Sequence, residues 1–125
     1  MLTEKDYCDY ETCVALREVG CRIETEWYIH QPSYERGSCY LCFGIPRETA
    51  VLDECDYIPR LSLYEAQKWL REEKHLHIEV RWYCNMWYEY EVKEAEGKVI
   101  AEGSAFPTYE EALRTAVYMA TEHLK

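Results

Sequence analysis

The pattern of residues 62–125 constrains the fold of this chain more than any other stretch. Ser62–Glu65 forms a capping box, in which the serine oxygen accepts a backbone N–H and the glutamate reaches back to the cap, so we expect a helix that ends near Lys74-His75. A second capped helix begins at Thr108 and keeps helical spacing of apolar residues to the C-terminus. Between the helices, alternating character predicts three strands: His77–Tyr83, Trp87–Lys93 and Lys98–Ser104.

The N-terminal half predicts the same order in a shorter form. Asp9 is a suitable N-cap for a helix from Tyr10 to about Val19, and Gly20 can end this helix in the left-handed conformation. Alternation predicts a strand over Cys21–His30. The apolar run Cys39–Ile45 predicts a second, buried strand.

Short sequence matches relate the two halves. Tyr10-Glu11, Leu16-Arg17-Glu18, Ile23-Glu24 and Trp27-Tyr28 recur as Tyr64-Glu65, Leu70-Arg71-Glu72, Ile78-Glu79 and Trp82-Tyr83. A single inserted residue between helix and strand aligns them all. We therefore predict two related helix–strand–strand units, in residues 9–45 and 62–125, which build two small sheets or one continuous sheet.

These elements together predict an α+β fold: an antiparallel sheet with about three helices, and an α-β-β-β-α order in the C-terminal half. A chain of 125 residues is expected to form one domain, here 1–125, and its 48% hydrophobic content argues against intrinsic disorder. Residues 46–61 are predicted to be a linker between the two units, with a short strand conceivable at Thr49–Leu52.

The charge of the chain restricts its partners. The net charge is −10, and Lys and Arg do not cluster as they do in proteins that displace counterions from phosphates, so no nucleic-acid binding is expected. The polar N-terminus Met1–Asp6 and the lack of a long apolar run predict a cytoplasmic protein without membrane contact. The seven cysteines are then expected to be free and mostly buried.

Two groups of residues are weak candidates for metal ligands. Cys39 and Cys42 have the C-x-x-C spacing of zinc sites, but positions three apart in a strand point to opposite faces. His75 and His77 flank a helix–strand junction, where a helix C-terminal histidine also complements the dipole. Structural roles are the simpler explanation for all four, and no cofactor is predicted.

The aromatic stretch 82–90 is the main candidate for an interaction surface. Alternation predicts that Ile78, Val80, Trp82, Met86, Tyr88, Tyr90 and Val92 lie beneath the helices. The opposite face then exposes Trp87, Tyr83, Arg81, Glu79 and Glu89, together with Glu91. Exposed Trp and Tyr among charges are typical of protein-binding hot spots. The alternative is that the N-terminal unit or a second copy of the chain covers this face.

No catalytic residue is predicted. The sequence contains no glycine-rich phosphate loop, no G-x-S-x-G and no H-E-x-x-H. The leading interpretation is a small non-enzymatic accessory protein that binds an unidentified protein or itself as a homodimer. The alternative is a small-ligand or metal-binding domain that uses His75, His77 and cysteines.

Two resemblances bear on this interpretation. The element order of residues 62–125 is similar to that of double-stranded-RNA-binding domains, which hold phosphates with basic residues at the start of the last helix; this chain has Glu110-Glu111 there, which argues against RNA binding. Three motifs resemble a group of small proteins of gut Bacteroides-type bacteria and their phages, for which no activity, cofactor or catalytic residue is established. These motifs are Leu63–Glu72, His75–Val80 and Tyr109–Leu113.

Overall fold

The computed structural model describes residues 2–30, 40–43 and 57–125 of the chain. These residues form helices and antiparallel sheets, so the predicted α+β class is confirmed. In chain order the elements are the 3₁₀-helix η1 (Glu4–Asp6), α1 (Tyr10–Glu18), β1 (Trp27–His30), β2 (Tyr40–Phe43), β3 (Tyr57–Pro59), α3 (Leu63–Glu73), β4 (His77–Tyr83), β5 (Trp87–Lys93), β6 (Val99–Phe106) and α4 (Tyr109–His123).

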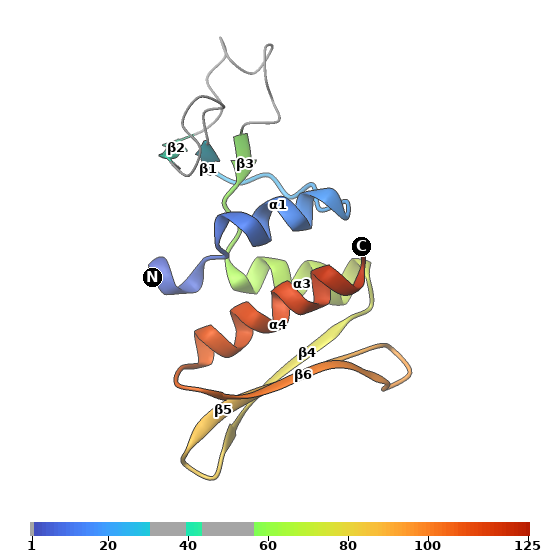
Figure 1. Ribbon diagram of the computed structural model, residues 1–125. Helices are drawn as coiled ribbons and strands as arrows, with labels where there is room; N and C mark the ends of the chain where they lie inside the picture. The colour runs from blue at the N-terminus through green and yellow to red at the C-terminus, as the bar shows by residue number, and fades with distance from the viewer. Residues whose placement is uncertain (1, 31–39, 44–56) are drawn as a thin grey trace.

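The elements stack in layers (Figure 1). The sheet β4-β5-β6 lies at one end, and α3 and α4 cover one of its faces. Helix α1 packs on the other side of these two helices, and the second sheet, β2-β1-β3, lies beyond α1. The sequence left open whether the strands form one sheet or two, and the described residues form two three-stranded sheets.

The C-terminal half has the predicted α-β-β-β-α order, and both of its helices begin at the caps predicted from the sequence. The Ser62 hydroxyl accepts the Glu65 N–H at 3.0 Å, and the Glu65 carboxylate accepts the Ser62 N–H at 3.1 Å, so the capping box is formed. At the start of α4, the Thr108 hydroxyl accepts the Glu111 N–H at 3.2 Å. Each cap satisfies an N–H that the first helical turn leaves without a partner.

The core lies between the three helices and the inner face of β4-β5-β6. Burying a Leu or Val side chain completely stabilises the folded chain by about 1.5–3 kcal/mol relative to leaving it exposed. The largest fully buried apolar side chains come from all three helices and from β5: Leu16, Leu63, Leu70, Val92, Leu113 and Val117.

The strand predicted over Cys21–His30 begins later, at Trp27. Gly20, with φ +104°, ends α1 in the left-handed conformation, and the Cys21 N–H then donates to the Leu16 carbonyl at 2.9 Å. Cys21 therefore belongs to the helix cap, and strand pairing starts only where β1 meets β2 and β3. Ile23, which the prediction placed within this strand, therefore precedes it.

The linker prediction is wrong at its C-terminal end. Residues 57–59 form β3, which pairs antiparallel with β1 and places Ile58 opposite Ile29. The pairing with β1 gives residues 57–59 hydrogen-bond partners for their backbone. The sequence pattern contains no signal for this pairing. Of the predicted second strand, Tyr40–Phe43 is formed. Cys39, residues 44–56 and the conceivable strand Thr49–Leu52 lie outside the described residues.

Gly103 in β6 is required by its neighbour across the sheet. A Cβ atom at this position would lie 2.6 Å from Tyr90 Cε1, so the tyrosine ring occupies the space that a side chain would take. Tyr90 is itself buried and its ring packs 5.7 Å from that of Phe106, so it cannot move aside. The glycine thus allows a large aromatic ring to fill the inner face of the sheet.

Gly103→Ala is therefore expected to lower the free energy of unfolding by about 1–3 kcal/mol, the usual cost of overpacking. Chemical denaturation of the variant measures this change. Ser104→Ala, at the exposed neighbouring position, is the matched control and should change stability by less than about 0.5 kcal/mol. Equal stability of the two variants would contradict the packing described here.

A hydrogen bond ties the N-terminal segment to α3. The Tyr64 hydroxyl donates to Asp6 Oδ1 at 2.7 Å, which joins η1 to the first turn of α3. This bond raises the pKa of Tyr64 to about 12. The pKa of Asp6 is lowered, first by the Thr3 backbone N–H and then by the Tyr64 hydroxyl. Because neutral Tyr64 is favoured in the folded chain, its contribution to stability is complete below pH 10 and is lost as pH rises toward 12.

Spectrophotometric titration of the native chain minus that of Tyr64→Phe should give a difference curve with its midpoint near pH 12. In an Asp6→Asn background the midpoint should fall toward the ordinary value of 10.0, because the charged acceptor is gone. A midpoint near 10 in the native chain would show that η1 does not dock on α3 through this bond.

Candidate functional site

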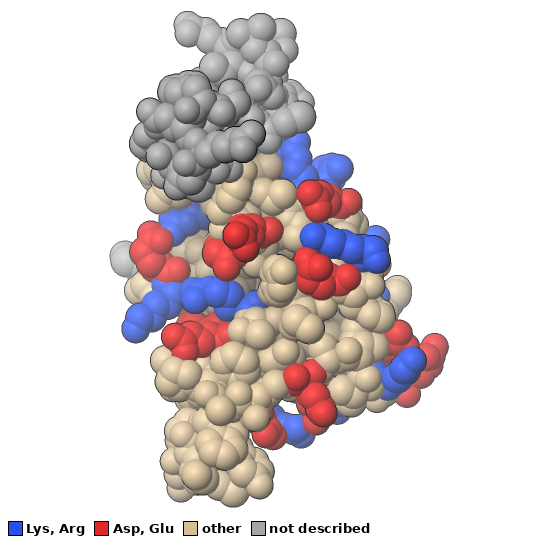
Figure 2. All heavy atoms as spheres, in the orientation of Figure 1, with Lys and Arg blue, Asp and Glu red and all other residues tan. Residues whose placement is uncertain are grey.

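The β4–β5 hairpin extends past the helices that cover the sheet (Figure 1). We call residues 82–88, which form its end, the aromatic hairpin. The end of the molecule formed by this hairpin shows no charged side chains, whereas charges are scattered over the body (Figure 2). Its base contacts α4, where the rings of Tyr88 and Tyr109 meet edge to face at 6.0 Å.

Cross-strand ring pairs hold the aromatic hairpin in one conformation. Trp82 and Tyr88 are partners in the sheet register, and their ring centroids are 4.6 Å apart. Tyr83 and Trp87 are the next pair, stacked at 5.7 Å. The Trp82 indole N–H also donates to Asn85 Oδ1 at 2.8 Å. Such aromatic pairs add about 0.5–1.5 kcal/mol each beyond the area they bury, so the rings are ordered before any partner binds.

Of these rings, Trp82 and Tyr83 are exposed to solvent, whereas Trp87 and Tyr88 are half-buried. Met86, Trp82 and Tyr83 have relative exposures of 64%, 51% and 47%. The prediction that Trp82 and Met86 lie beneath the helices is wrong, because the strands continue beyond the ends of those helices. It is confirmed for the residues nearer the middle of the sheet, which are buried or partly buried: Ile78, Val80, Tyr90 and Val92.

The outer face of β4-β5-β6 carries the charged residues predicted for it. Arg81 lies 2.8 Å from the Glu91 carboxylate and 3.4 Å from that of Glu89. Lys93 lies 3.4 Å from Glu79 and 3.2 Å from Glu91. These bonds, first that of Lys93 and then that of Arg81, lower the pKa of Glu91, while the carboxylates raise the pKa values of both cations. The pairs are exposed, so they organise the surface more than they stabilise the fold.

The outer face is acidic overall. Glu79 faces Glu91 in the register, and Glu91 faces Glu102 on β6. No Lys, Arg or His of the described chain lies within 4.0 Å of the Glu102 carboxylate. Four carboxylates (Glu79, Glu89, Glu91 and Glu102) and two cations (Arg81 and Lys93) leave this surface with a net charge of −2.

No described element covers the outer face. The N-terminal unit packs on the opposite side of α3 and α4, so the alternative that this unit covers the face is wrong for the residues that the structure describes. The interaction surface predicted from the sequence is therefore solvent-accessible at its charged part. Of the two aromatic residues predicted for this face, Tyr83 is exposed and Trp87 is half-buried. The sequence did not reveal that Trp82 and Met86 are exposed as well.

The turn of the hairpin has an unfavourable backbone conformation. Cys84 and Asn85 both have positive φ, +48° and +56°, and the Met86 N–H donates to the Tyr83 carbonyl at 2.9 Å. Left-handed φ costs most residues about 1–2 kcal/mol, whereas asparagine tolerates it. Backbone strain of this kind is often concentrated at functional sites.

The weak metal candidates do not come together in the described part of the chain. His75 is exposed and has φ +57°, where it lets the Leu76 N–H reach the Leu70 carbonyl at 3.0 Å and end α3. His77 is exposed at the start of β4. Cys42 lies in β2, but its side chain and all of Cys39 fall outside what the structure describes. Within residues 2–30, 40–43 and 57–125, no three His, Cys, Asp or Glu side chains gather as metal ligands would.

Comparison with known protein families, with curated proteins and with solved structures finds no match to this chain. None of the helices in the described segments is long and apolar enough to cross a membrane.

Cys84→Gly should raise the free energy of unfolding by up to about 1 kcal/mol, because glycine adopts positive φ without a Cβ clash. Thermal or chemical denaturation measures the gain. Asn85→Gly is the matched control and should give a smaller gain, since asparagine already tolerates this conformation. A loss of stability in Cys84→Gly would mean that the turn differs from the one described.

Proposed function

We propose that this chain is a non-enzymatic accessory protein that binds another protein through the aromatic hairpin. The observation that carries the proposal is that Trp82, Tyr83 and Met86 are exposed together at an uncharged end of the molecule. Trp82 and Tyr83 are successive residues of β4, so the exposed apolar side chains lie on both sides of the hairpin end. Large exposed apolar side chains that gather on a globular protein typically mark an interaction site. Trp and Tyr are also the residues most enriched among binding hot spots.

The order of the hairpin supports binding because it lowers the entropic cost of association. Each side chain immobilised on binding costs about 0.5–1.5 kcal/mol. Here the Trp82 ring is already fixed by Tyr88 and by the Asn85 side chain, at 4.6 and 2.8 Å. Met86 adds a flexible side chain that can adapt to an irregular pocket.

Charge complementarity defines the kind of partner. The chain has a net charge of −10, and the outer face beside the hairpin has an unpaired Glu102 in its acidic row. A second copy would bring the same charges and be repelled, whereas a basic surface would be attracted. The partner is thus a protein with an apolar pocket for the hairpin and Lys or Arg side chains beside it, which contact the outer face.

Recognition by side chains fits the structure better than the addition of a strand to a sheet edge. On the β4 edge strand, the Gln67 side chain of α3 donates to the Ile78 carbonyl at 3.2 Å. The β5–β6 ladder has register shifts, and Ala105 near the end of β6 has φ +69°. Capped carbonyls and irregular edges are the means by which proteins discourage strand addition.

Cys84 provides a direct experiment, because it is exposed while Cys8, Cys13 and Cys21 are buried. With Cys39, Cys42 and Cys55 changed to serine, a benzophenone maleimide on Cys84 should crosslink the partner on irradiation, and mass spectrometry identifies the crosslinked peptide. The matched control carries the same group at position 118 of α4, in Tyr118→Cys with Cys84→Ser. We expect a basic protein to be crosslinked from position 84 and not from position 118.

Binding of the purified partner should then depend on the hairpin side chains. Trp82→Ala with Met86→Ala should weaken binding by about 30-fold or more, the effect of losing a hot-spot residue. The matched pair Tyr118→Ala and Met119→Ala, each residue 39% exposed on α4, should leave affinity unchanged. Thermal midpoints of all variants separate loss of binding from loss of folding.

Two results would contradict the proposal. One is a crosslink from position 84 to a second copy of this chain, which would show that the hairpin serves self-association. The other is a partner whose affinity is unaffected by Trp82→Ala with Met86→Ala.

A further inference from the structure

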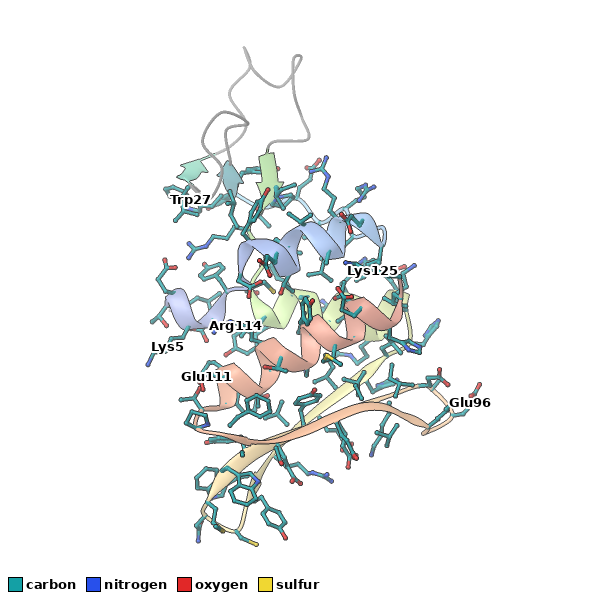
Figure 3. All side chains as sticks on the ribbon, viewed as in Figure 1. Lys5, Trp27, Glu96, Glu111, Arg114 and Lys125 are labelled. Atoms are coloured by element: carbon teal, nitrogen blue, oxygen red, sulfur yellow. The ribbon has the colours of Figure 1, made fainter. Side chains whose placement is uncertain are left out.

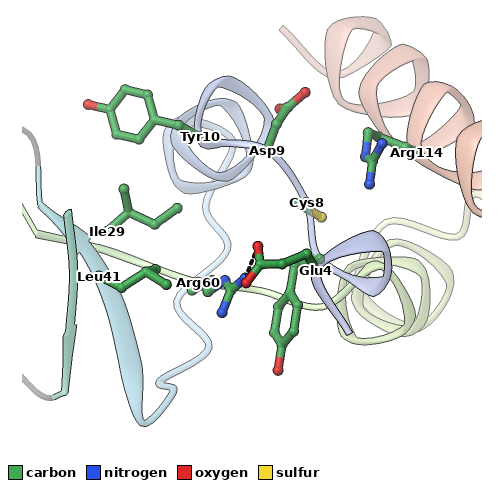
Figure 4. Close-up of a pocket in the computed structure, with 9 residues that line it drawn as sticks. Glu4, Cys8, Asp9, Tyr10, Ile29, Leu41, Arg60 and Arg114 are labelled. Atoms are coloured by element: carbon green, nitrogen blue, oxygen red, sulfur yellow. Dashed lines mark ion pairs between the residues drawn. The ribbon is translucent and has the colours of Figure 1, made fainter. Parts of the chain in front are cut away.

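A second site lies on the other side of the molecule from the aromatic hairpin. A pocket of about 360 Å³ opens between η1, the start of α1 and the sheet β2-β1-β3 (Figure 4). This volume is within the range of small-molecule sites. Its apolar side is formed by Tyr10, Ile29 and Leu41, and its polar side includes Arg60 and Arg114.

Arg60 is a largely buried cation that several contacts hold in place. Its side chain is only 12% exposed, and its guanidinium carbon lies 3.8 Å from the centre of the Tyr7 ring. Its backbone N–H donates to the Trp27 carbonyl at 3.0 Å, which fixes the residue beside β1. A guanidinium held on an aromatic ring keeps its remaining donors oriented for a planar anion.

The anion that now occupies this position is a side chain of the protein itself. The Glu4 carboxylate lies 2.6 Å from Arg60 Nη2, yet the Glu4 side chain is 82% exposed (Figure 4). Glu4 belongs to the short helix η1, so few neighbours hold it in place. Because Glu4 is so exposed, its carboxylate gains little from the pair with Arg60 and can be exchanged for another anion.

A second guanidinium borders the pocket from α4. Arg114 donates from Nη2 to the Lys5 carbonyl at 3.1 Å, and the two residues lie together in Figure 3. Its Nε is buried and has no acceptor among the described residues. The other nearby carboxylate, that of Asp9, is already used as the α1 N-cap, where Oδ1 accepts the Thr12 N–H at 2.8 Å. The polar side of the pocket therefore has more donors than acceptors once Glu4 moves away.

We propose that this pocket binds a small organic carboxylate with an apolar body. The ligand carboxylate replaces Glu4 on the Arg60 guanidinium, and Arg114 adds positive charge nearby. The apolar body of the ligand lies against Ile29 and Leu41. Because Arg60 and Arg114 both carry positive charge, an amine of the same shape is excluded. This site shares no residue with the aromatic hairpin and does not depend on the function proposed for it.

The test uses 3-phenylpropanoate, with its uncharged analogue 3-phenylpropanamide and inorganic phosphate as comparison ligands. Backbone amide shifts in ¹H–¹⁵N spectra of the full chain report binding. We expect saturable shifts around residues 4–10 and at Ile29, Leu41 and Arg60 with the carboxylate only. If phosphate alone shifted these signals, the pocket would recognise inorganic anions and the proposed apolar body would be wrong.

Glu4→Gln is the deciding variant, because it removes the competing anion and leaves the pocket wall in place. It should bind 3-phenylpropanoate about two- to fivefold more tightly, which is the effect of losing an exposed ion pair. Arg60→Gln should abolish binding, and Arg114→Gln, which is independent of the Tyr7 contact, covers the case in which Arg60→Gln fails to fold. Equal binding of carboxylate and amide, or no tightening in Glu4→Gln, would overturn the proposal.

Discussion

The packing of α4 between two layers is the contact on which the rest of the structure depends. One side of the helix contacts β4, β5 and β6, and other sides contact α1 and α3. Alanines at positions 112, 116 and 120 are fully buried, and their small side chains let the helix approach its neighbours closely. Because α4 takes up the inner face of the sheet and α1 packs beyond it, the N-terminal unit is kept away from the outer face.

This arrangement gives the molecule two unlike ends. At one end the β4–β5 hairpin extends past the helices that cover the sheet, and its rings pair with one another across the strands. Rings that pair within the hairpin stay ordered even though no helix lies over them, which explains how exposed Trp82 and Tyr83 are tolerated. At the other end the short strands β1, β2 and β3 leave a pocket against η1, in which the largely buried Arg60 side chain forms an ion pair with the exposed carboxylate of Glu4.

Local signals in the sequence predicted most of the fold, and tertiary packing determined the remainder. Helix caps depend on residues that are close in the sequence, so the caps at Asp9, Ser62 and Thr108 could be predicted from it. The same holds for the alternation of apolar and polar residues in β4 and β5. The alternation of apolar and polar residues assigns each side chain to one face of the sheet, but it does not show where the covering helix ends. For this reason the sequence predicted Trp82 and Met86 to lie in the core. The pocket could not be predicted at all, because Glu4, Arg60 and Arg114 are brought together from three distant segments.

Exposure of the Trp82 ring in the isolated chain can be measured by ¹⁹F spectra of protein labelled with 5-fluorotryptophan. The chain has four tryptophans, so Trp→Phe variants assign each resonance. We expect the Trp82 resonance to show a clear solvent isotope shift between H₂O and D₂O, because the ring is 51% exposed, and we expect this shift to stay unchanged over a dilution series from millimolar to micromolar. A Trp82 resonance protected from solvent throughout the series would contradict this expectation, since the ring would then be buried within the chain or in a stable dimer.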